Sequence, residues 1–277
     1  MAERGVRRVI GQKHLLSILD AQYKENKLPK FVIIVGVRGS EKNLVAKELA
    51  KQNDMIFIQA QDCKVDTMRT IISEAYRAVV PTIFNITDAD DMSVTAKNSI
   101  LKLTEEPPKF AYIVLTVENK ENLLETIVSR GAVYQTDCYS AAQIESYIDT
   151  KQVSDRDKSI LLEFCRTPGD VDMVLSYNPS EFKDFVLKVR AHVAEVSGAN
   201  VFKIANNIKL KDSDDGKYDL STFLRAFCYV CMNENLYNGA RVTSQFLTDS
   251  FTKSVNRSML FDSWLLSIRE EWRDECC

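Results

Sequence analysis

Residues 31–43, FVIIVGVRGSEKN, decide the expected fold. The apolar run at residues 31–35 has the length and composition of a buried strand, and the residues from 43 onward have the 3.6-residue period of a helix. A loop with two glycines, residues 36–42, joins the two. Such a strand–loop–helix unit can hold a phosphate, because the backbone N–H groups of the loop and the positive end of the helix dipole both face the anion.

The loop matches a phosphate-binding pattern in part. A working loop reads G-x-x-x-x-G-K-[ST], and Gly36 and Lys42 fit this pattern. Glu41 replaces the second glycine and brings a negative charge to the place where a phosphate would approach. Asn43 replaces the hydroxyl that would ligate Mg²⁺. Taken alone, the match leaves open an accidental likeness in an ordinary strand–turn–helix.

Outward from this loop, short apolar runs alternate with helical patterns as far as residue 135. The expected strands are residues 31–35, 55–58, 82–86 and 112–116, with a weaker one at 132–135. The expected helices between them are residues 43–51, 66–78, 94–104 and a short one near 123–128. Alternation of this kind predicts a parallel sheet with helices on both faces, which binds ligands beyond the carboxyl ends of its strands.

Beyond residue 138 the pattern is helical. The expected helices are residues 140–150, 154–166, 169–177, 181–196, 201–208, 218–234 and 244–273. The polar segment 209–216 predicts a loop, and Asn178-Pro179-Ser180 predicts a break between helices. The expected domains are an α/β domain over residues 1–138, a small helical domain over 139–178 and a helical bundle over 179–277.

The composition is typical of an ordinary soluble protein with two or three domains. The 277 residues carry a formal net charge of −3, which argues against a protein that grips DNA alone through a dense basic face. The longest apolar run is far shorter than a membrane span, and the first residues lead into no signal-peptide core. Seven scattered cysteines favour reduced thiols over a disulfide framework. We therefore expect a cytoplasmic protein without a membrane partner.

A long run of fixed offsets begins at the third expected strand. Residues 83–90, IFNITDAD, combine an apolar strand with an acidic cluster, and the pattern continues to Glu105-Glu106-Pro107-Pro108. This run resembles the signature D-[DE]-A-D-x-M-x-x-x-A-x-N-x-[LI]-L-K-x-x-E-E-P-P of clamp-loader subunits in the AAA+ superfamily. A charged helix end stopped by proline would explain the last four residues alone. It would not explain the whole run.

Other segments resemble the same family in the same order. Residues 9–12, VIGQ, resemble the box near the adenine, and residues 64–69, KVDTMR, resemble a segment of bacterial delta-prime and gamma/tau subunits. Residues 123–131, LLETIVSRG, resemble the element L-P-x-T-I-x-S-R-C, and residues 169–175, GDVDMVL, resemble the sensor 2 segment. The resemblance covers residues 6–178. It implies an α/β P-loop AAA+ domain, a helical lid domain and an all-α collar domain.

ATP hydrolysis needs a phosphate cradle, a carboxylate for Mg²⁺, an acid that activates water and positive charge on the γ-phosphate. The resemblance implies a degenerate nucleotide site, which would be lined by Gly36, Lys42, Asn43, Asp88 and, in the turn called sensor 1, Glu118. Thr87 takes the place of the Mg²⁺-binding aspartate, Asp88 is a shorter replacement for the catalytic glutamate, and Asp172 reverses the charge of sensor 2. We therefore expect no bound ATP or Mg²⁺.

One catalytic group of the family is intact. Arg130 matches the arginine that, in this family, projects across a subunit boundary towards the ATP of a neighbour. A decayed ATP site together with an intact arginine finger is the pattern of the delta-prime subunits. The alternative is that Arg130 pairs with a local carboxylate.

We expect no metal site. Many bacterial relatives carry four zinc-binding cysteines between the loop and the acidic strand, and here that interval holds only Cys63. Cys228 and Cys231 form a CxxC within a helical apolar run, but the sequence offers no second pair. Because structural zinc takes four ligands, cysteines buried on a helix face are the expected arrangement.

The resemblance therefore implies a delta-prime-like, ATPase-deficient subunit of the DNA polymerase III clamp loader, which helps place the sliding clamp on primed DNA during DNA replication. Its implied partners are the delta and gamma/tau-like subunits, with the clamp and primed DNA reached through the complex. Two alternatives remain open. One is an ATP-hydrolysing gamma/tau-like motor subunit of the same loader, and the other is an AAA+-derived adaptor such as a helicase-loading partner.

Overall fold

The computed structural model describes residues 9–193, 200, 218–250 and 256–275. The chain forms two compact units, of which the first holds residues 1–143 together with 167–169. The second holds residues 144–166 and 170–277. The expected boundary between a small helical domain and a C-terminal bundle, at residue 178, falls inside the second unit. The three-domain division therefore stays a prediction.

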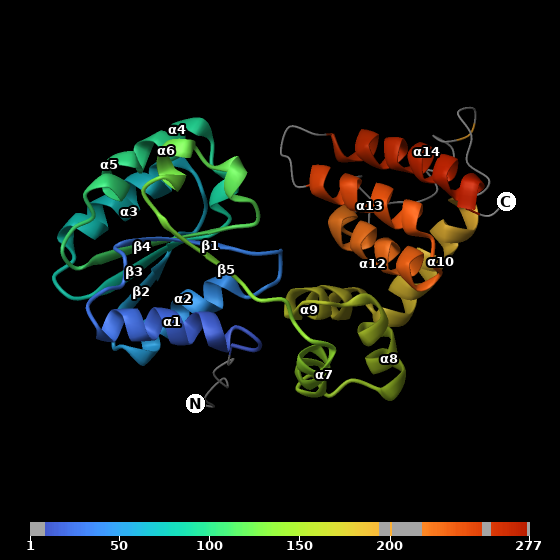
Figure 1. The fold of residues 1–277 in the computed structure, drawn as a ribbon, viewed down its shortest axis with the longest axis horizontal. Helices are drawn as coiled ribbons and strands as arrows, with labels where there is room; N and C mark the ends of the chain where they lie inside the picture. The colour runs from blue at the N-terminus through green and yellow to red at the C-terminus, as the bar shows by residue number, and fades with distance from the viewer. Residues whose placement is uncertain (1–8, 194–199, 201–217, 251–255, 276–277) are drawn as a thin grey trace. The chain divides into compact units, whose positions relative to one another are not determined.

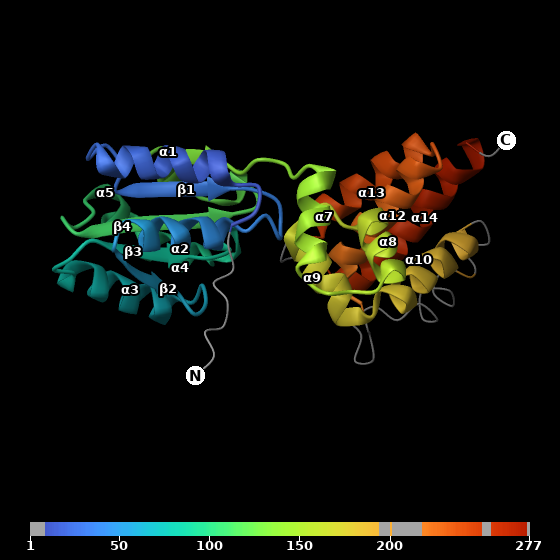
Figure 2. The ribbon, with the colours of Figure 1, turned by 90° about the horizontal axis from the view of Figure 1, so that it is seen from below.

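The first unit is built on a five-stranded parallel sheet with the strand order β2-β3-β4-β1-β5. Figure 2 shows β1, β4, β3 and β2 side by side in this order. The strands are β1 Phe31–Val35, β2 Ile56–Gln59, β3 Thr82–Ile86, β4 Ala111–Val117 and β5 Ala132–Gln135. The expected parallel sheet is confirmed, and the strand bounds agree with the expected ones to within a residue.

Helices cover both faces of this sheet (Figure 1). One face carries α1 Lys13–Lys24 and α2 Lys42–Gln52. The other face carries α3 Val65–Arg77, α4 Val94–Ser99, α5 Leu101–Glu105 and α6 Glu125–Val128. Two short 3₁₀ turns complete the unit, η1 Ala89–Asp91 and η2 Lys120–Asn122. An α/β layer of this kind buries both faces of the sheet, which explains why every residue of β1 and β3 is buried.

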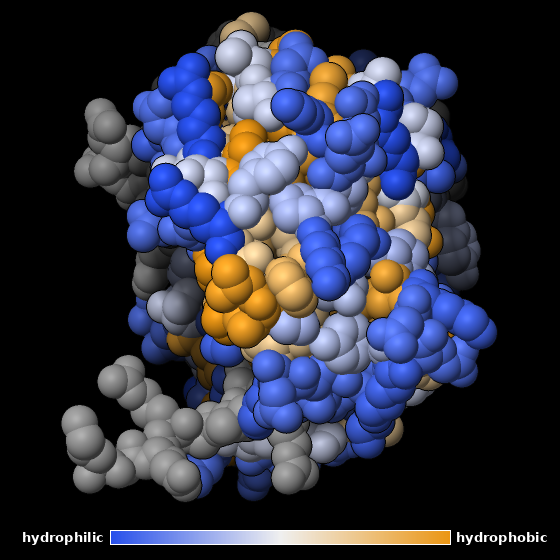
Figure 3. Space-filling view, turned by 90° about the vertical axis from the view of Figure 1, so that its left-hand side faces the viewer, coloured by the Kyte–Doolittle hydropathy of each residue, from blue (hydrophilic) through white to orange (hydrophobic). Residues whose placement is uncertain are grey.

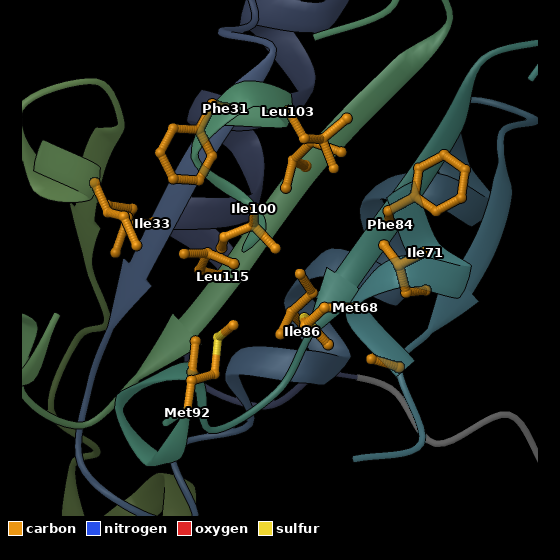
Figure 4. Packing of buried hydrophobic residues seen from close by; sticks show 14 of the residues in the cluster. Phe31, Ile33, Met68, Ile71, Phe84, Ile86, Met92, Ile100, Leu103 and Leu115 are labelled. Atoms are coloured by element: carbon orange, nitrogen blue, oxygen red, sulfur yellow. The ribbon is translucent and has the colours of Figure 1, made fainter. Parts of the chain in front are cut away.

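Alternate residues of the central strands point into two separate cores. Phe31 and Ile33 of β1 pack with the α3–α6 layer, together with Met68, Phe84 and Leu115 (Figure 4). Val32 and Ile34 of β1 face α1 and α2 instead. Because successive side chains of a strand point to opposite faces, a single apolar run supplies both cores.

The single helix expected over residues 94–104 is wrong in detail. The structure has two short helices, α4 and α5, which meet at Ile100. Ile100 keeps near-helical backbone angles and is fully buried in the α3–α6 core. The break is thus slight, and the apolar period continues across it, so the sequence carries no signal for it.

The described part of the second unit is helical. Its helices are α7 Ala141–Asp149, α8 Asp155–Phe164, α9 Pro168–Tyr177, α10 Pro179–Val193, α12 Leu220–Asn233, α13 Tyr237–Asp249 and α14 Arg257–Glu275, of which α7 and α9 begin in the first unit. The expected helix at residues 201–208 lies outside the described residues. The expected break at residue 178 is confirmed, because α9 ends at Tyr177 and α10 begins at Pro179.

The single long helix expected over residues 244–273 is wrong. α13 ends at Asp249, and α14 begins at Arg257 and packs back against α13. Both helices contribute to one aromatic core, in which Phe223 and Phe227 of α12 lie edge-on to Trp264 of α14. The apolar period is similar on both sides of the reversal, and residues 250–256 contain neither glycine nor proline. The signals that the sequence does give are weaker: Ser, Thr, Asp and Asn make up six of residues 248–256, and Oδ1 of Asn256 accepts hydrogen bonds from the backbone N–H groups of Ser258 and Met259 in α14.

No helix among the described residues is both long enough and apolar enough to cross a membrane. On the face of the molecule drawn in Figure 3, apolar surface occurs in small groups among hydrophilic residues. Isolated exposed apolar side chains are normal on a protein surface and need no special explanation.

We predict that Thr243 stabilises the helical core through its hydroxyl. The Oγ1 atom of Thr243 accepts a hydrogen bond from Nε1 of the buried Trp264, at 3.2 Å, and donates one to the carbonyl of Gly239, at 2.8 Å. Thr243→Val keeps the shape but leaves the indole N–H without its acceptor, which should lower the free energy of unfolding by about 1–3 kcal/mol. The measurement is the urea unfolding midpoint at unchanged slope.

Thr248 of the same helix is the matched control. It is exposed, and its hydroxyl donates to a carbonyl four residues back, that of Ser244, as Thr243 does to Gly239. Thr248→Val should change stability by less than about 0.5 kcal/mol. Equal effects of the two substitutions would show that the bond to Trp264 contributes nothing.

Candidate functional site

The loop at residues 36–43 follows β1 at the carboxyl edge of the sheet. Because β4 lies next to β1 and β3 next to β4, the ends of these three strands meet at this edge. Asp88 follows β3, and Glu118 follows β4. The structure therefore brings Gly36, Lys42, Asn43, Asp88 and Glu118 to one edge, at the position where open parallel sheets bind ligands.

Glu41, at the position of the second glycine in the phosphate-loop pattern, has a backbone conformation that favours glycine. Its φ is 62° and its ψ is 24°, in the left-handed region that side chains with a Cβ rarely adopt. One carboxylate oxygen, Oε2, accepts a hydrogen bond from the backbone N–H of Ile10 at 3.1 Å. A residue with a Cβ thus holds a turn that favours glycine, and its acidic side chain joins the loop to the segment at residues 9–12.

Lys42 bonds to its own loop. Its Nζ donates to the carbonyl oxygens of Gly36, at 2.7 Å, and Val37, at 3.0 Å, and only 6% of the residue is exposed. Burial lowers the pKa of Lys42, while the negative charges of Glu118 and Asp88 oppose this shift. The ammonium group that would meet a phosphate is therefore engaged by loop carbonyls and held near two carboxylates.

Asn43 is held by polar side chains from two strands. Its Oδ1 accepts hydrogen bonds from Oγ1 of Thr116 on β4, at 2.8 Å, and from Nδ2 of Asn85 on β3, at 3.2 Å. Asn85 and Thr116 are both fully buried, and Oδ1 of Asn85 has no hydrogen-bond partner among the described residues. The group that replaces the Mg²⁺-binding hydroxyl thus accepts two bonds from within the sheet.

Sequence reasoning missed Asn85 and Thr116 as members of this site. Each is a polar residue in a strand that is otherwise almost wholly apolar, TIFNI for β3 and AYIVLTV for β4. A buried polar side chain needs a partner, so polar residues near the carboxyl ends of such strands are a usable signal. What the sequence cannot reveal is that both residues bond to the same atom of Asn43.

The acidic cluster after β3 is linked to the turn after β4. Oδ2 of Asp90 accepts hydrogen bonds from the backbone N–H groups of Glu118, at 3.0 Å, and Asn119, at 3.3 Å. Asp88 has a left-handed φ of 49°, and its side chain reaches the surface. Desolvation by surrounding protein atoms raises the pKa of Asp88, although the nearby Lys42 ammonium favours the charged form.

Residues 167–169 lie against the loop as part of the first unit. The backbone N–H of Gly169 donates to the carbonyl of Gly39 at 3.2 Å. A Cβ added to Gly169 would lie 2.3 Å from the Cα of Gly39, and Gly39 itself has a φ of +79°. The two backbones approach so closely that both positions require glycine.

Arg130 does not join the other expected site residues. It precedes β5 by two residues, and the first residue of β5, Ala132, pairs with Val32 at the amino end of β1. The loop begins at the other end of β1, at Gly36. At about 3.3 Å per residue, roughly 15 Å along the strands separates Arg130 from the loop. Arg130 is therefore at the opposite edge of the sheet.

In the free chain Arg130 forms an ion pair with a local carboxylate. Nη2 lies 2.8 Å from Oε1 of Glu105, and Nη1 donates to the carbonyl of Thr126. The pair is solvent-exposed, so its contribution to stability is small. The alternative considered for Arg130, a local ion pair, is thus observed, and it leaves the side chain at the surface.

Asp172, at the position of the sensor 2 arginine, belongs to the second unit. Its two carboxylate oxygens accept hydrogen bonds from the hydroxyl of Tyr147, both at 2.9 Å, and Oδ1 lies 2.7 Å from Nζ of Lys151. The carboxylate is therefore part of a polar cluster on α7 and α9 and the turn after α7.

Among the described residues, no group of three or more His, Cys, Asp or Glu side chains is arranged to hold a metal ion. Cys231 is buried within α12, and Cys228 of the same helix is partly buried with its pKa raised by desolvation. The expected placement of the CxxC on a helix is confirmed, and the absence of a bound metal stays a prediction.

Comparison with known proteins points to replication proteins. A family model described as DNA polymerase III, delta subunit, matches residues 51–138. DNA polymerase III subunit gamma of Buchnera aphidicola subsp. Acyrthosiphon pisum is 24% identical over 172 residues, 51% of this chain and 48% of that protein. Subunit tau of Bacillus subtilis is 23% identical over 256 residues, 78% of this chain and 46% of that protein.

Subunit delta′ of Bacillus subtilis is 46% identical over 48 residues, 17% of this chain and 15% of that protein. The matches support the clamp-loader AAA+ family. The aligned parts cover less than half of the length of each of these three relatives. Gamma, tau and delta′ chains are all among the matches, so they support the clamp-loader family without separating its subunit types.

Solved structures share the fold of this chain at low sequence identity. A DNA polymerase III gamma subunit-related protein of Thermotoga maritima has a TM-score of 0.51 and 16% identity, with 92% of this chain and 99% of that chain covered. The FIGL-1 AAA domain in complex with ADP has a TM-score of 0.52 and 13% identity, covering 81% and 83%. The expected AAA+ fold is confirmed.

We predict that the backbone strain at Glu41 can be measured by comparing two variants. Glu41→Ala and Glu41→Gly both lose the bond to Ile10, but only glycine relieves the left-handed conformation. Glu41→Gly should therefore be more stable than Glu41→Ala by about 1 kcal/mol. Lys47, exposed in the middle of α2, is the control, because Lys47→Gly should be less stable than Lys47→Ala by about 1 kcal/mol.

The measurement for all four variants is denaturant unfolding under one set of conditions. Opposite signs of the glycine–alanine difference at the two positions are expected. The same sign at both positions would mean that Glu41 does not hold the left-handed conformation in solution.

Proposed function

We propose that this chain is a delta-prime-like subunit of the DNA polymerase III clamp loader that does not hydrolyse ATP itself. It would help the complex to place the sliding clamp on primed DNA during DNA replication, in the cytoplasm. Its partners would be the delta subunit and a gamma/tau-like ATPase subunit. The clamp and primed DNA would be reached through the assembled complex.

The arrangement of the loop at residues 36–43 carries this proposal. Three groups that should face a nucleotide have partners within the protein. Glu41 bonds to Ile10, Lys42 bonds to loop carbonyls, and Asn43 bonds to buried side chains of β3 and β4. A nucleotide would have to replace these bonds, and it would approach the added negative charge of Glu41. Thr87 at the Mg²⁺ position supplies no carboxylate.

The position of Arg130 agrees with a role in a neighbour's site. It lies at the opposite sheet edge from the loop, so within one chain it cannot reach a phosphate bound there. Its guanidinium lies at the surface, where a second subunit can approach. An arginine finger acts by stabilising charge that develops on the transferred phosphoryl group. We propose that Arg130 has this role in trans.

A gamma/tau-like motor subunit is the second candidate, and two observations favour it. Gamma and tau chains are among the matches, and Lys42 is retained with Asp88 and Glu118 nearby. Such a subunit must release Lys42 from its loop and bind Mg²⁺ without the usual hydroxyl and aspartate. An AAA+-derived adaptor, such as a helicase-loading partner, is the third candidate. Co-purification with loader subunits or with a helicase separates it from the other two.

The first test is calorimetric titration of the isolated chain with Mg-ATP. We expect binding weaker than ~1 mM, which corresponds to about −4 kcal/mol. A gamma/tau-like subunit encoded by the same genome, titrated in the same buffer, serves as the positive control. A micromolar site in this chain would contradict the proposal and favour the motor subunit.

The second test is Arg130→Ala in a ring reconstituted with wild-type ATPase subunits, clamp and primed DNA. Loss of an arginine finger lowers turnover at the site it serves by ~10³–10⁵-fold. Because this chain would complete one of several sites, total DNA-stimulated ATPase should fall only in part while assembly is unchanged. Arg130→Lys should rescue poorly, because lysine keeps the charge but lacks the planar fork of donors. Unchanged rates in an assembled ring would exclude the finger assignment.

A further inference from the structure

The guanidinium of Arg130 is anchored at two points. Nη2 pairs with Oε1 of Glu105, the last residue of α5, at 2.8 Å. Nη1 donates to the backbone carbonyl of Thr126 in α6. Both anchors belong to helices that pack against the α3–α6 core, through Leu103 and Ile127. The flexible end of a long side chain is thus attached to two fixed points of the fold.

These two contacts leave part of the guanidinium available. The group carries five N–H donors in a rigid plane, and the contacts with Glu105 and Thr126 engage two of them. The Arg130 side chain is 35% exposed. An anion from a second subunit can therefore bind the remaining donors without displacing Glu105. A side chain that is already oriented also loses less conformational freedom when that anion binds.

The strength of the Arg130–Glu105 ion pair shows whether Glu105 orients Arg130 or restrains it from binding an anion. An exposed ion pair is weak, yet together with the bond to the Thr126 carbonyl it favours one orientation of the side chain. The pair is too weak to hold the arginine back from a polyphosphate, to which guanidinium binds through two parallel charge-assisted bonds. A restraining role for Glu105 would require a far stronger contact than this one.

We propose that Glu105 is a positioning residue for Arg130. It fixes the plane of the guanidinium so that the free donors face a phosphoryl group bound by the neighbouring subunit. This inference rests on the proposed function for the role of Arg130 in trans. The orientation of the guanidinium by Glu105 can be tested without that function.

Glu106 provides the matched control. It is the next residue, it carries the same charge, and its side chain is exposed as that of Glu105 is. Glu105→Gln and Glu106→Gln therefore remove the same charge from neighbouring positions. Only the first removes the carboxylate that pairs with Arg130.

The first experiment measures ¹⁵N relaxation of the Arg130 Nε–H group in the isolated full-length chain. Glu105→Gln should lower the order parameter of this group, and Glu106→Gln should leave it unchanged. Backbone order parameters should stay the same in both variants, which shows that the fold is intact. An unchanged Arg130 order parameter in Glu105→Gln would overturn the positioning role.

The second experiment uses the ring reconstituted with wild-type ATPase subunits, clamp and primed DNA. The Arg130-dependent ATPase rate is the difference between the rates of the wild-type ring and the Arg130→Ala ring. Glu105→Gln should lower the maximal Arg130-dependent ATPase rate about fivefold, as expected for loss of an exposed ion pair. KM should change little. Glu106→Gln should have no effect. In the Arg130→Ala background, Glu105→Gln should cause no further loss.

The outcomes separate the two proposals. If Arg130→Ala has no effect on the ring, the finger assignment fails, while the relaxation experiment still decides whether Glu105 orients Arg130. If Arg130→Ala lowers the rate but Glu105→Gln does not, the finger stands and the positioning role is wrong. A higher rate for Glu105→Gln would mean that Glu105 restrains Arg130, which also overturns the inference.

Discussion

The parallel direction of all five strands is the constraint on which the rest of the structure depends. In such a sheet, every segment that follows a strand emerges at one edge, and every segment that precedes a strand lies at the other. The loop after β1, the acidic cluster after β3 and the turn after β4 therefore gather together. Arg130, which precedes β5, is placed away from them by the same rule. One chain thus carries the loop and the acidic residues at one edge and an arginine at the other.

The loop after β1 is held by hydrogen bonds within the protein. Lys42 finds acceptors in its own loop, and Asn43 finds donors in the two neighbouring strands. In a working site of this family, the groups at these positions would be satisfied by phosphate and Mg²⁺. Internal hydrogen bonds meet that need for Lys42 and Asn43, because buried polar groups are costly only when they lack partners. The loop can therefore keep its folded form without a ligand, although Oδ1 of Asn85 still lacks a partner among the described residues.

The sequence predicts the first unit well and the second unit less well. Buried parallel strands are short apolar runs between helical patterns, so β1 and β3 are found to the residue. The reversal between α13 and α14 is marked only by Ser, Thr, Asp and Asn residues, without glycine or proline, and the packing of Trp264 on Thr243 joins distant segments. At the site, comparing the sequence with the phosphate-loop pattern shows which positions carry a different residue. The sequence cannot show that Glu41 keeps a left-handed backbone or that Asn85 and Thr116 share one acceptor, because these facts depend on three-dimensional contacts.

The close approach of Gly39 and Gly169 has a consequence for how this chain can change over time. The contact joins two backbones, so no nucleotide and no side-chain chemistry takes part in it. If this chain does not bind ATP, as proposed, positions such as 43, where an asparagine stands in place of a Mg²⁺-binding hydroxyl, are free to change. Neither glycine is free to change, since any side chain would push the segment at residues 167–169 away from the loop. Selection would then preserve the shape of an ATP-binding loop long after selection for its chemistry has ended.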